Sequence, residues 1–262
     1  MTTTIGTQLP ADVESLMRGL RLPHARAIAA DVLATARAQR WDPTEVIKAL
    51  LSEEVAGRAR SMLASRHKAA GFPTGKTFDA WDPTSSSIPL PTQQALQTLE
   101  WVHRRENLVV CGPAGTGKTF FLEALGQKVI EAGMPVAWFT LEQIGVLVRA
   151  HRADDSLGKA VAKIVRAELV VIDDVGLLPV GADAAEGLYR IVEAAYERKS
   201  VAISSNLHPS KWLTMTADTL LAQSAIDRLT ANAHTLVIEG PSYRQRNRPG
   251  RLDPDRPNSH PQ

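Results

Sequence analysis

The residues with the clearest chemistry form a glycine-rich stretch that ends in a lysine and a threonine. An apolar run at 108–111 precedes this stretch and residues with helical spacing follow it, so the order is strand, loop, helix. In that order the N–H groups of the loop form an anion-binding nest, and the positive end of the helix faces phosphate. The spacing GxxxxGK[ST] therefore predicts a nucleotide-phosphate site, with an ordinary glycine-rich turn as the alternative. The stretch reads Gly112-Pro113-Ala114-Gly115-Thr116-Gly117-Lys118-Thr119.

The end of this motif supplies the side chains that would meet ATP and its magnesium ion. We expect Lys118 to reach the β- and γ-phosphates. We expect the hydroxyl of Thr119 to bind Mg²⁺. Phe120 opens the following helix, and we include it with the loop among the nucleotide-binding residues.

A second element that an ATP site requires is a carboxylate at the end of a neighbouring strand. The apolar run 169–172 is followed directly by Asp173 and Asp174. A parallel strand delivers such residues to the carboxyl edge of its sheet, where the phosphate loop also lies. We expect Asp173 to hold Mg²⁺, directly or through water, and Asp174 to orient or deprotonate the attacking water. Two carboxylates in a simple turn are the alternative.

Two further polar residues follow later in the chain. Asn206 comes after the apolar run 201–204, where it would help position the attacking water; a turn-forming asparagine is the alternative. Arg228 closes the helix before the last strand, and we expect it to face the nucleotide of a neighbouring subunit. There it would stabilise transition-state charge as an arginine finger. A surface ion pair with Asp227 is the alternative.

Composition points to a protein of the reducing cytoplasm. The 262 residues are 44% hydrophobic and 22% charged, with a formal net charge of +2, which is ordinary for a globular chain. Cys111 is the single cysteine, so no internal disulfide can form, and we expect a buried apolar residue rather than a nucleophile. No apolar run is long enough to span a membrane and the N-terminus has no signal-peptide core, so we expect no membrane association.

The hydrophobic pattern divides the chain into four parts. Residues 1–70 are alanine-rich with helical spacing and predict a small all-helical domain. Residues 71–91 form a linker. Residues 92–247 alternate helices and apolar strands, which predicts an α/β core with a five-stranded parallel sheet covered on both faces. Residues 248–262 are basic and proline-rich, and we expect disorder. We expect a first core helix over 92–104 and strands at 108–111, 135–139, 169–172, 201–204 and 235–238.

The linker is rich in Gly, Pro, Ser and Thr, yet it also carries Phe72, Phe78 and Trp81. Aromatic side chains of this kind need a surface to cover them. We expect them to pack on the core, with a place beside the nucleotide base as the alternative.

Basic residues gather at the end of the third N-terminal helix, after its acidic residues. This order matches the helix dipole, so a solvated helix end is one interpretation. Contact with DNA phosphates is the other. The candidate DNA-contact residues are Arg58, Arg60, Arg66 and Lys68.

Taken together, these motifs resemble the AAA+ ATPases of the DnaC/IstB group. The closer resemblance is to IstB-like proteins, the ATP-binding helpers of bacterial insertion-sequence transposases. It extends over about residues 16–247; the phosphate loop is specific to nucleotide binding in general, and the terminal stretches point to this group. Besides the phosphate loop, the matching stretches are Leu20-Arg21-Leu22-Pro23, Leu50-Leu51-Ser52-Glu53-Glu54, Ala70-Gly71-Phe72-Pro73, Ile172-Asp173-Asp174-Val175-Gly176, Ser204-Ser205-Asn206-Leu207 and Gly240-Pro241-Ser242-Tyr243-Arg244.

The resemblance implies roles for individual residues. It makes Asn206 the sensor I residue, Arg228 a finger acting in trans, and Arg244 a late arginine that reaches the nucleotide or its neighbour. It also implies a P-loop AAA+ core without a C-terminal helical lid domain. One departure is Asp174, where many AAA+ proteins have Glu; the shorter side chain argues against fast hydrolysis.

For the whole protein, the resemblance implies an ATP-dependent homo-oligomer on duplex DNA that recruits and stimulates a cognate transposase. Phosphate contacts would make its DNA binding strongly salt-dependent. A helicase loader of the DnaC type is the first alternative, because it shares the same core. A small-molecule kinase with the same phosphate loop is the second, although the chain shows no acceptor-binding lid and Arg228 would then have no role.

Overall fold

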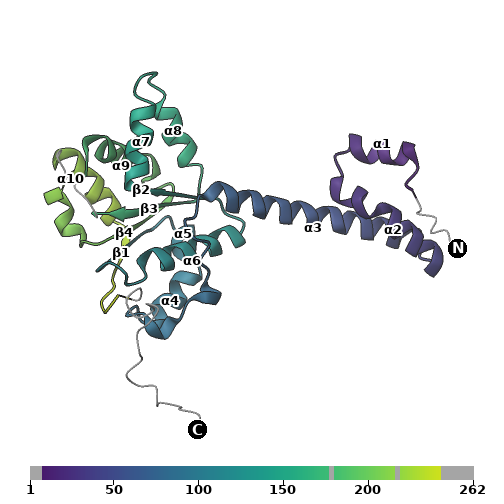
Figure 1. Cartoon of the computed structure of the whole chain (residues 1–262), viewed down its shortest axis with the longest axis horizontal. Helices are drawn as coiled ribbons and strands as arrows, with labels where there is room; N and C mark the ends of the chain where they lie inside the picture. The colour runs from purple at the N-terminus through teal and green to yellow at the C-terminus, as the bar shows by residue number, and fades with distance from the viewer. Residues whose placement is uncertain (1–7, 177–179, 216–218, 243–262) are drawn as a thin grey trace, which may run out of the picture. The chain divides into compact units, whose positions relative to one another are not determined.

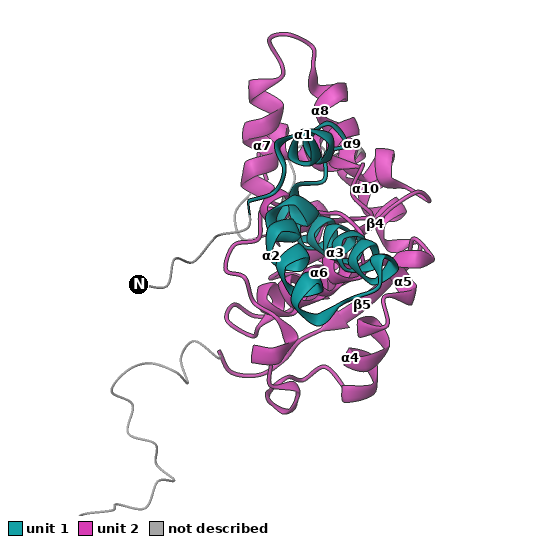
Figure 2. Cartoon of the chain, turned by 90° about the vertical axis from the view of Figure 1, so that its right-hand side faces the viewer, with its two compact units in different colours: residues 1–65 teal, residues 66–262 magenta. Residues whose placement is uncertain are grey.

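The computed structural model describes residues 8–176, 180–215 and 219–242. Arg244 and the basic tail 248–262 lie outside the described residues. The chain divides into two compact units, residues 1–65 and 66–262, coloured separately in Figure 2. The boundary that we predict after residue 70 and the observed division after residue 65 fall on the same helix, α3 (Pro43–Ala70).

The described part of the first unit is helical, as its sequence predicts. It contains α1 (Ala11–Gly19), α2 (Pro23–Gln39) and most of α3. Proline begins both α2 and α3, where its missing N–H costs no helical hydrogen bond. The Asp42 carboxylate accepts from the Thr44 N–H at 2.8 Å and caps α3. A small core forms around Met17, Ala25 and Ala29.

Within the described residues, the second unit is built on a parallel sheet of five strands. The strand order is β2-β3-β4-β1-β5, so β4 lies between the strand that precedes the phosphate loop and the strand that ends in the two aspartates. The three central strands are buried almost throughout, which explains their continuous apolar runs. The predicted α/β fold is therefore confirmed. The bounds are β1 Asn107–Cys111, β2 Val136–Thr140, β3 Leu169–Val175, β4 Ser200–Ser205 and β5 Ala233–Val237.

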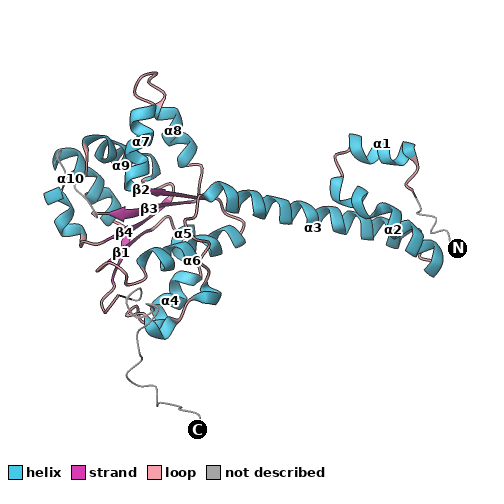
Figure 3. Ribbon diagram, in the orientation of Figure 1, coloured by secondary structure: helices cyan, strands magenta, loops and turns pink. Residues whose placement is uncertain are grey.

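Helices cover both faces of this sheet (Figure 1 and Figure 3). One face carries α6 (Lys118–Glu131), and the other carries α7 (Leu141–Ala150), α9 (Ala182–Ala195) and α10 (Thr219–Thr230). The helix α8 (Leu157–Ile164) packs beside α7 and α9, and the short helix η3 (Pro209–Met215) packs on α10. Among the described residues, no helix combines the length and the apolar character that crossing a bilayer requires.

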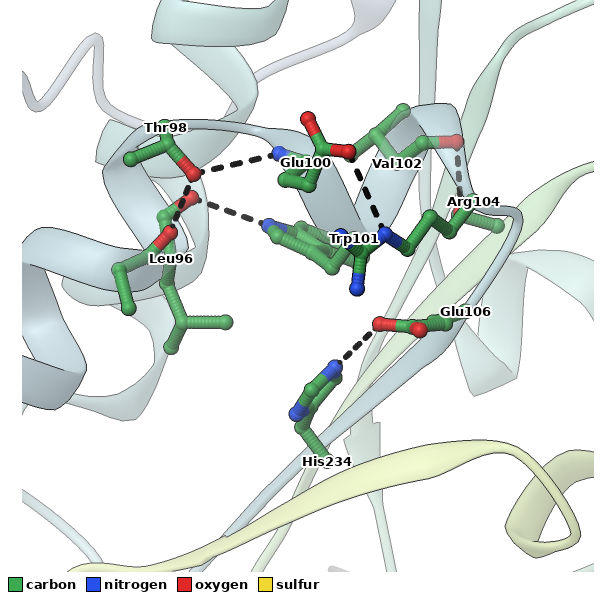
Figure 4. Close-up of polar contacts among 10 residues, drawn as sticks. Leu96, Thr98, Glu100, Trp101, Val102, Arg104, Glu106 and His234 are labelled. Atoms are coloured by element: carbon green, nitrogen blue, oxygen red, sulfur yellow. Dashed lines mark hydrogen bonds and ion pairs between the residues drawn. The ribbon is translucent and has the colours of Figure 1, made fainter.

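The helix predicted over 92–104 is wrong in one respect, because the structure breaks it in two. The first piece is α4 (Leu90–Gln97) and the second is α5 (Glu100–His103), with Leu99 between them in the left-handed region at φ 62°. Figure 4 shows how the corner is held: the indole N–H of Trp101 donates to the Leu96 carbonyl at 3.1 Å. The chain then enters β1, and Glu106 at its start bonds His234 of β5 at 2.6 Å.

The linker packs on α6, as predicted. Phe78 meets Phe121 edge to face, with ring centroids 5.7 Å apart, and Trp81 meets Phe120 at 5.2 Å. Phe72 packs at Trp138 with centroids 5.9 Å apart. Two short 3₁₀ turns, η1 (Phe78–Ala80) and η2 (Pro83–Ser85), shape this segment.

A buried carboxylate fixes the start of the linker. Glu123 of α6 is fully buried. It accepts hydrogen bonds from the Thr74 N–H at 3.0 Å, from the Thr74 hydroxyl at 2.7 Å and from the Gly75 N–H. A buried acceptor with three donors anchors the linker to the helix that begins at the phosphate loop.

We predict that Glu123→Ala destabilises the protein by about 1–3 kcal/mol, because it removes three hydrogen bonds that Thr74 and Gly75 make to a buried carboxylate. Glu131→Ala is the matched control, since Glu131 ends the same helix and is exposed; we expect a change within about 0.5 kcal/mol. Urea unfolding of both variants measures the difference, and equal midpoints would contradict the anchoring role.

Candidate nucleotide site

The phosphate loop has a backbone that only glycine allows at two of its positions. Gly112 and Gly115 adopt φ values of 152° and 82°. A Cβ on Gly112 would collide with the carbonyl oxygen of Ile238, and one on Gly115 with the side chain of Ser242. The loop is therefore closely packed against the segment that follows β5, and its N–H groups are free to turn inward as a nest.

Lys118 lies at the centre of the site. It is only 7% exposed. Its Nζ donates to the carbonyls of Gly112 and Pro113, both at 2.8 Å, and to Asn206 Oδ1 at 2.9 Å. The predicted lysine and the predicted strand-end asparagine thus meet. Their contact follows from the strand order, because Asn206 comes directly after β4, next to β1.

Thr119 and Asp173 also meet, as the magnesium assignment requires. The Thr119 hydroxyl donates to Asp173 Oδ1 at 3.2 Å. Burial raises the pKa of Asp173 above its usual value, and the nearby charge of Asp174 acts in the same direction. A cation at this carboxylate would reverse that shift.

The donor set around Asp173 fits Mg²⁺. Among the described residues, no three His, Cys, Asp or Glu side chains gather as a self-sufficient metal cluster. One hydroxyl and one carboxylate suit Mg²⁺, which takes few protein ligands and keeps water and substrate phosphates. Thr119 and Asp173 would hold the ion, and the phosphates of ATP would complete its shell.

Asp174 is separated from Asp173 by an irregularity of the strand. The register between β3 and β4 shifts between Ile172 and Val175, and Asp174 takes a left-handed φ of 59°. As a result Asp173 is 3% exposed and lies against Thr119, whereas Asp174 is exposed. Asp174 lines a hollow of about 420 Å³, together with residues from the starts of α7 and α9.

The structure adds Ser204, whose role the sequence reasoning missed. Its hydroxyl donates to Asp173 Oδ1 and accepts from the Asp174 N–H at 3.0 Å. Ser204 is fully buried in β4, so one side chain fixes both aspartates. A serine in an apolar strand beside the Asp-Asp strand was the available signal, but it has meaning only once the strand order is known.

The linker contributes a wall to the site. Trp81 and Phe120 line a small hollow of about 50 Å³ beside the loop, with Thr116, Gly117 and Pro241. The Trp81 indole N–H donates to Gln93 Oε1 at 2.8 Å. Gln93 is fully buried and donates in turn to the carbonyls of Pro83 and Ile88. Trp81 therefore both packs on the core and borders the phosphate loop.

Comparison with known proteins agrees with this geometry. The family model of IstB-like ATP-binding proteins matches residues 15–250. The chain belongs to this family. A relative from Pseudomonas aeruginosa, named as an ATP-binding protein of insertion sequence IS21, is 30% identical over 234 residues, which are 89% of this chain and 88% of the relative. A relative from Mycobacterium tuberculosis, named as an ATP-binding protein in an insertion sequence, is 31% identical over 79% of this chain and 83% of its own length.

Solved structures show the fold that this IstB-like protein shares. The DnaC helicase loader matches with a TM-score of 0.52 and 16% identity, over 63% of this chain and 98% of the loader. The replication initiator DnaA, bound to AMPPCP and single-stranded DNA, matches with a TM-score of 0.52 and 18% identity, over 65% of this chain and 52% of the initiator. The core is thus a P-loop AAA+ domain, as the sequence predicted.

Arg228 does not join the other predicted site residues. It lies on α10, 3.8 Å from Glu193 of α9 and with its guanidinium 5.8 Å from the centre of the Tyr189 ring. The surface ion pair that is the alternative for this residue is thus observed, with Glu193 as the partner and not the predicted Asp227.

The candidate DNA-contact arginines of α3 carry partners of their own. Arg58 pairs with Glu54 at 2.7 Å and donates to the Arg21 carbonyl, and Arg60 pairs with Glu53. Both side chains are more than half exposed. Their role in DNA binding, like that of Arg66 and Lys68, stays a prediction.

For Asp174→Asn, we predict that ATP binding is retained while hydrolysis falls by about 10²-fold or more, because the amide cannot accept the proton of the attacking water. Release of phosphate under saturating ATP measures the rate. Asp183→Asn is the matched control, since Asp183 lines the same hollow but pairs with Arg152 at 2.6 Å; we expect its rate within about twofold of the original. An unchanged rate in Asp174→Asn would remove this residue from the mechanism.

Proposed function

We propose that this IstB-like protein is an ATP-dependent transposition helper. It oligomerises on duplex target DNA, hydrolyses ATP at the interfaces between its subunits, and recruits and stimulates a transposase. Two lines of support are the assembled phosphate and magnesium residues and the relatives named for insertion sequences.

The observation that carries this proposal is the separation of Arg228 from its own phosphate loop. Asn107 at the start of β1 donates its side-chain N–H to the Leu229 carbonyl at 2.9 Å, so the end of α10 lies at the amino edge of the sheet. The loop lies beyond Cys111 at the carboxyl edge, and β1 between them is about 13 Å long. That distance exceeds the reach of an arginine side chain. If Arg228 contacts ATP, the ATP belongs to another subunit.

The proposed chemistry assigns each residue one task. Lys118 and the loop N–H groups bind the phosphates and neutralise their charge, while Thr119 and Asp173 hold Mg²⁺. Asn206 orients the γ-phosphate and the attacking water, and Asp174 accepts the water's proton. Arg228 from the neighbour stabilises the charge that develops in the transition state. Hydrolysis then requires assembly, because one chain supplies only part of the site.

DNA binding is proposed to rest on backbone phosphates. The positive side chains of α3 and of the core would make contacts that do not depend on base sequence. For Arg60 this requires exchange of Glu53 for phosphate, which is inexpensive for a largely exposed ion pair. The partner of Arg58, Glu54, is buried, but it would keep its hydrogen bonds from the N–H groups of His24 and Ala25.

The helicase loader remains the second candidate. Its support is the shared core, which covers 98% of the solved DnaC loader chain but only 63% of this chain. The insertion-sequence relatives match nearly the full length of both chains, and this favours transposition. Membership of the IstB-like family argues against the small-molecule kinase.

The first test is assembly. We expect the protein to form large oligomers only with ATP and duplex DNA together, visible by analytical ultracentrifugation and electron microscopy. Lys118→Ala should remain unassembled, because loss of the ammonium removes the central phosphate contact. A protein that stays monomeric with ATP and duplex, or that assembles only on single-stranded DNA, would contradict the transposition proposal, and the second result would favour a loader.

The second test asks whether Arg228 acts in trans. Arg228→Ala and Lys118→Ala should each be inactive alone. When they are mixed, interfaces that join an intact loop to an intact arginine reappear and restore part of the hydrolysis rate. Because Lys118→Ala alone does not assemble, about a quarter of the original rate is the upper limit, reached only when both variants enter mixed oligomers equally. Complete absence of rescue, with mixed oligomers demonstrated by differently tagged chains, would show that the finger does not act between subunits.

A further inference from the structure

Two side chains of α9, Tyr189 and Glu193, hold Arg228 on the surface of its own subunit. Tyr189 and Glu193 lie one turn apart on α9, and the Tyr189 hydroxyl donates to Glu193 Oε1 at 3.1 Å. The same carboxylate oxygen lies 3.8 Å from Arg228 Nη1 of α10. The Tyr189 ring faces the guanidinium at 5.8 Å. Tyr189, Glu193 and Tyr196 together raise the pKa of Arg228, the interaction with Tyr189 contributing most.

The guanidinium of Arg228 is held in place, but not all of its N–H groups have a hydrogen-bond acceptor. A separation of 3.8 Å is too long for a hydrogen bond. Accordingly, Arg228 Nη1 is buried and has no hydrogen-bond partner among the described residues. The Arg228 side chain is 34% exposed and that of Glu193 is 51% exposed. Arg228 thus has its charge compensated while one of its donors, the buried Nη1, has no acceptor.

The two partners of Arg228 restrain it in different ways. An aromatic ring attracts the flat face of a guanidinium and leaves the N–H groups at its edge available. A carboxylate attracts those N–H groups themselves, and it therefore competes with any phosphate for them. Tyr189 can stay in contact while Arg228 binds phosphate, but Glu193 must give way.

We propose that Tyr189 and Glu193 are positioning residues for Arg228. In a subunit without a neighbour, Glu193 binds the guanidinium that would otherwise bind the phosphate of the neighbour's nucleotide. This inference rests on the proposed action of Arg228 in trans. It adds an intramolecular competitor that sets how readily two subunits form an active interface. The pair with Glu193 breaks when the triphosphate of the neighbour arrives, because the phosphate carries more charge and accepts two N–H groups at once.

The test measures ATP hydrolysis, with saturating ATP and duplex DNA, as a function of protein concentration. Glu193→Gln keeps the size of the side chain and removes its charge. We therefore expect the protein concentration that gives half-maximal ATP hydrolysis to fall about two- to fivefold. Tyr189→Phe keeps the ring and removes the hydroxyl that holds Glu193, so we expect a smaller fall. Tyr189→Ala removes the ring and should lower kcat. ATP binding to the separate subunit should be unchanged in all three, because its own phosphate loop is at the opposite edge of the sheet.

Two controls separate this inference from the function on which it rests. Glu186→Gln changes a carboxylate on the same helix that pairs with Arg152 and Arg190, and its curve should match the original. In an Arg228→Ala background, Glu193→Gln should restore no hydrolysis, because the arginine that it releases is missing. If the half-maximal protein concentration of Glu193→Gln is unchanged or raised while Arg228→Ala is still inactive, Glu193 does not compete for Arg228. The proposed function is then unaffected. Full activity of Arg228→Ala alone overturns both.

Discussion

The site depends on the position of β4 between β1 and β3. This order brings the end of β4 next to the phosphate loop on one side and next to the two aspartates on the other. Asn206 then bonds Lys118, and Ser204 bonds Asp173 and the N–H of Asp174. A sheet in which β1 and β3 were neighbours would place the loop and the carboxylates together but would leave no strand end between them. The inserted strand therefore supplies the polar groups that connect the phosphate loop to the two aspartates.

The sequence predicted those features that a short stretch encodes by itself. The phosphate loop, the Asp-Asp strand end and the five apolar strands each carry their signal within a few residues. Ser204 could not be assigned in this way, because its partners depend on the order of the strands. The break at Leu99 was also hidden, since leucine favours helices and no Gly or Pro marks the corner. Likewise, Glu123 reads as an ordinary polar residue of an amphipathic helix, and only the fold shows that it is buried under the linker.

The linker belongs functionally with the ATPase core, although its composition suggests a flexible connector. Glu123 holds its first residues, Phe78 packs on α6, and Trp81 borders the loop. The buried amide of Gln93 then fixes Trp81 and two carbonyls of the same segment. Because this segment follows α3 directly, the N-terminal helices are connected in sequence to a wall of the nucleotide site. This continuity of the chain gives a route by which a structural change in the N-terminal unit can alter the nucleotide site. A change at the nucleotide site can reach the N-terminal unit by the same route.

The left-handed backbone at Asp174 has a consequence for the type of carboxylate that can occupy this position. Aspartate and asparagine enter that region of conformational space several times more readily than most other residues, so the bulge in β3 favours the shorter acid. This position therefore takes a shorter side chain in exchange for a less strained backbone. In the proposed mechanism, a base with shorter reach hydrolyses ATP slowly. A long-lived ATP complex fits the proposed function, in which the protein stays at one place on DNA.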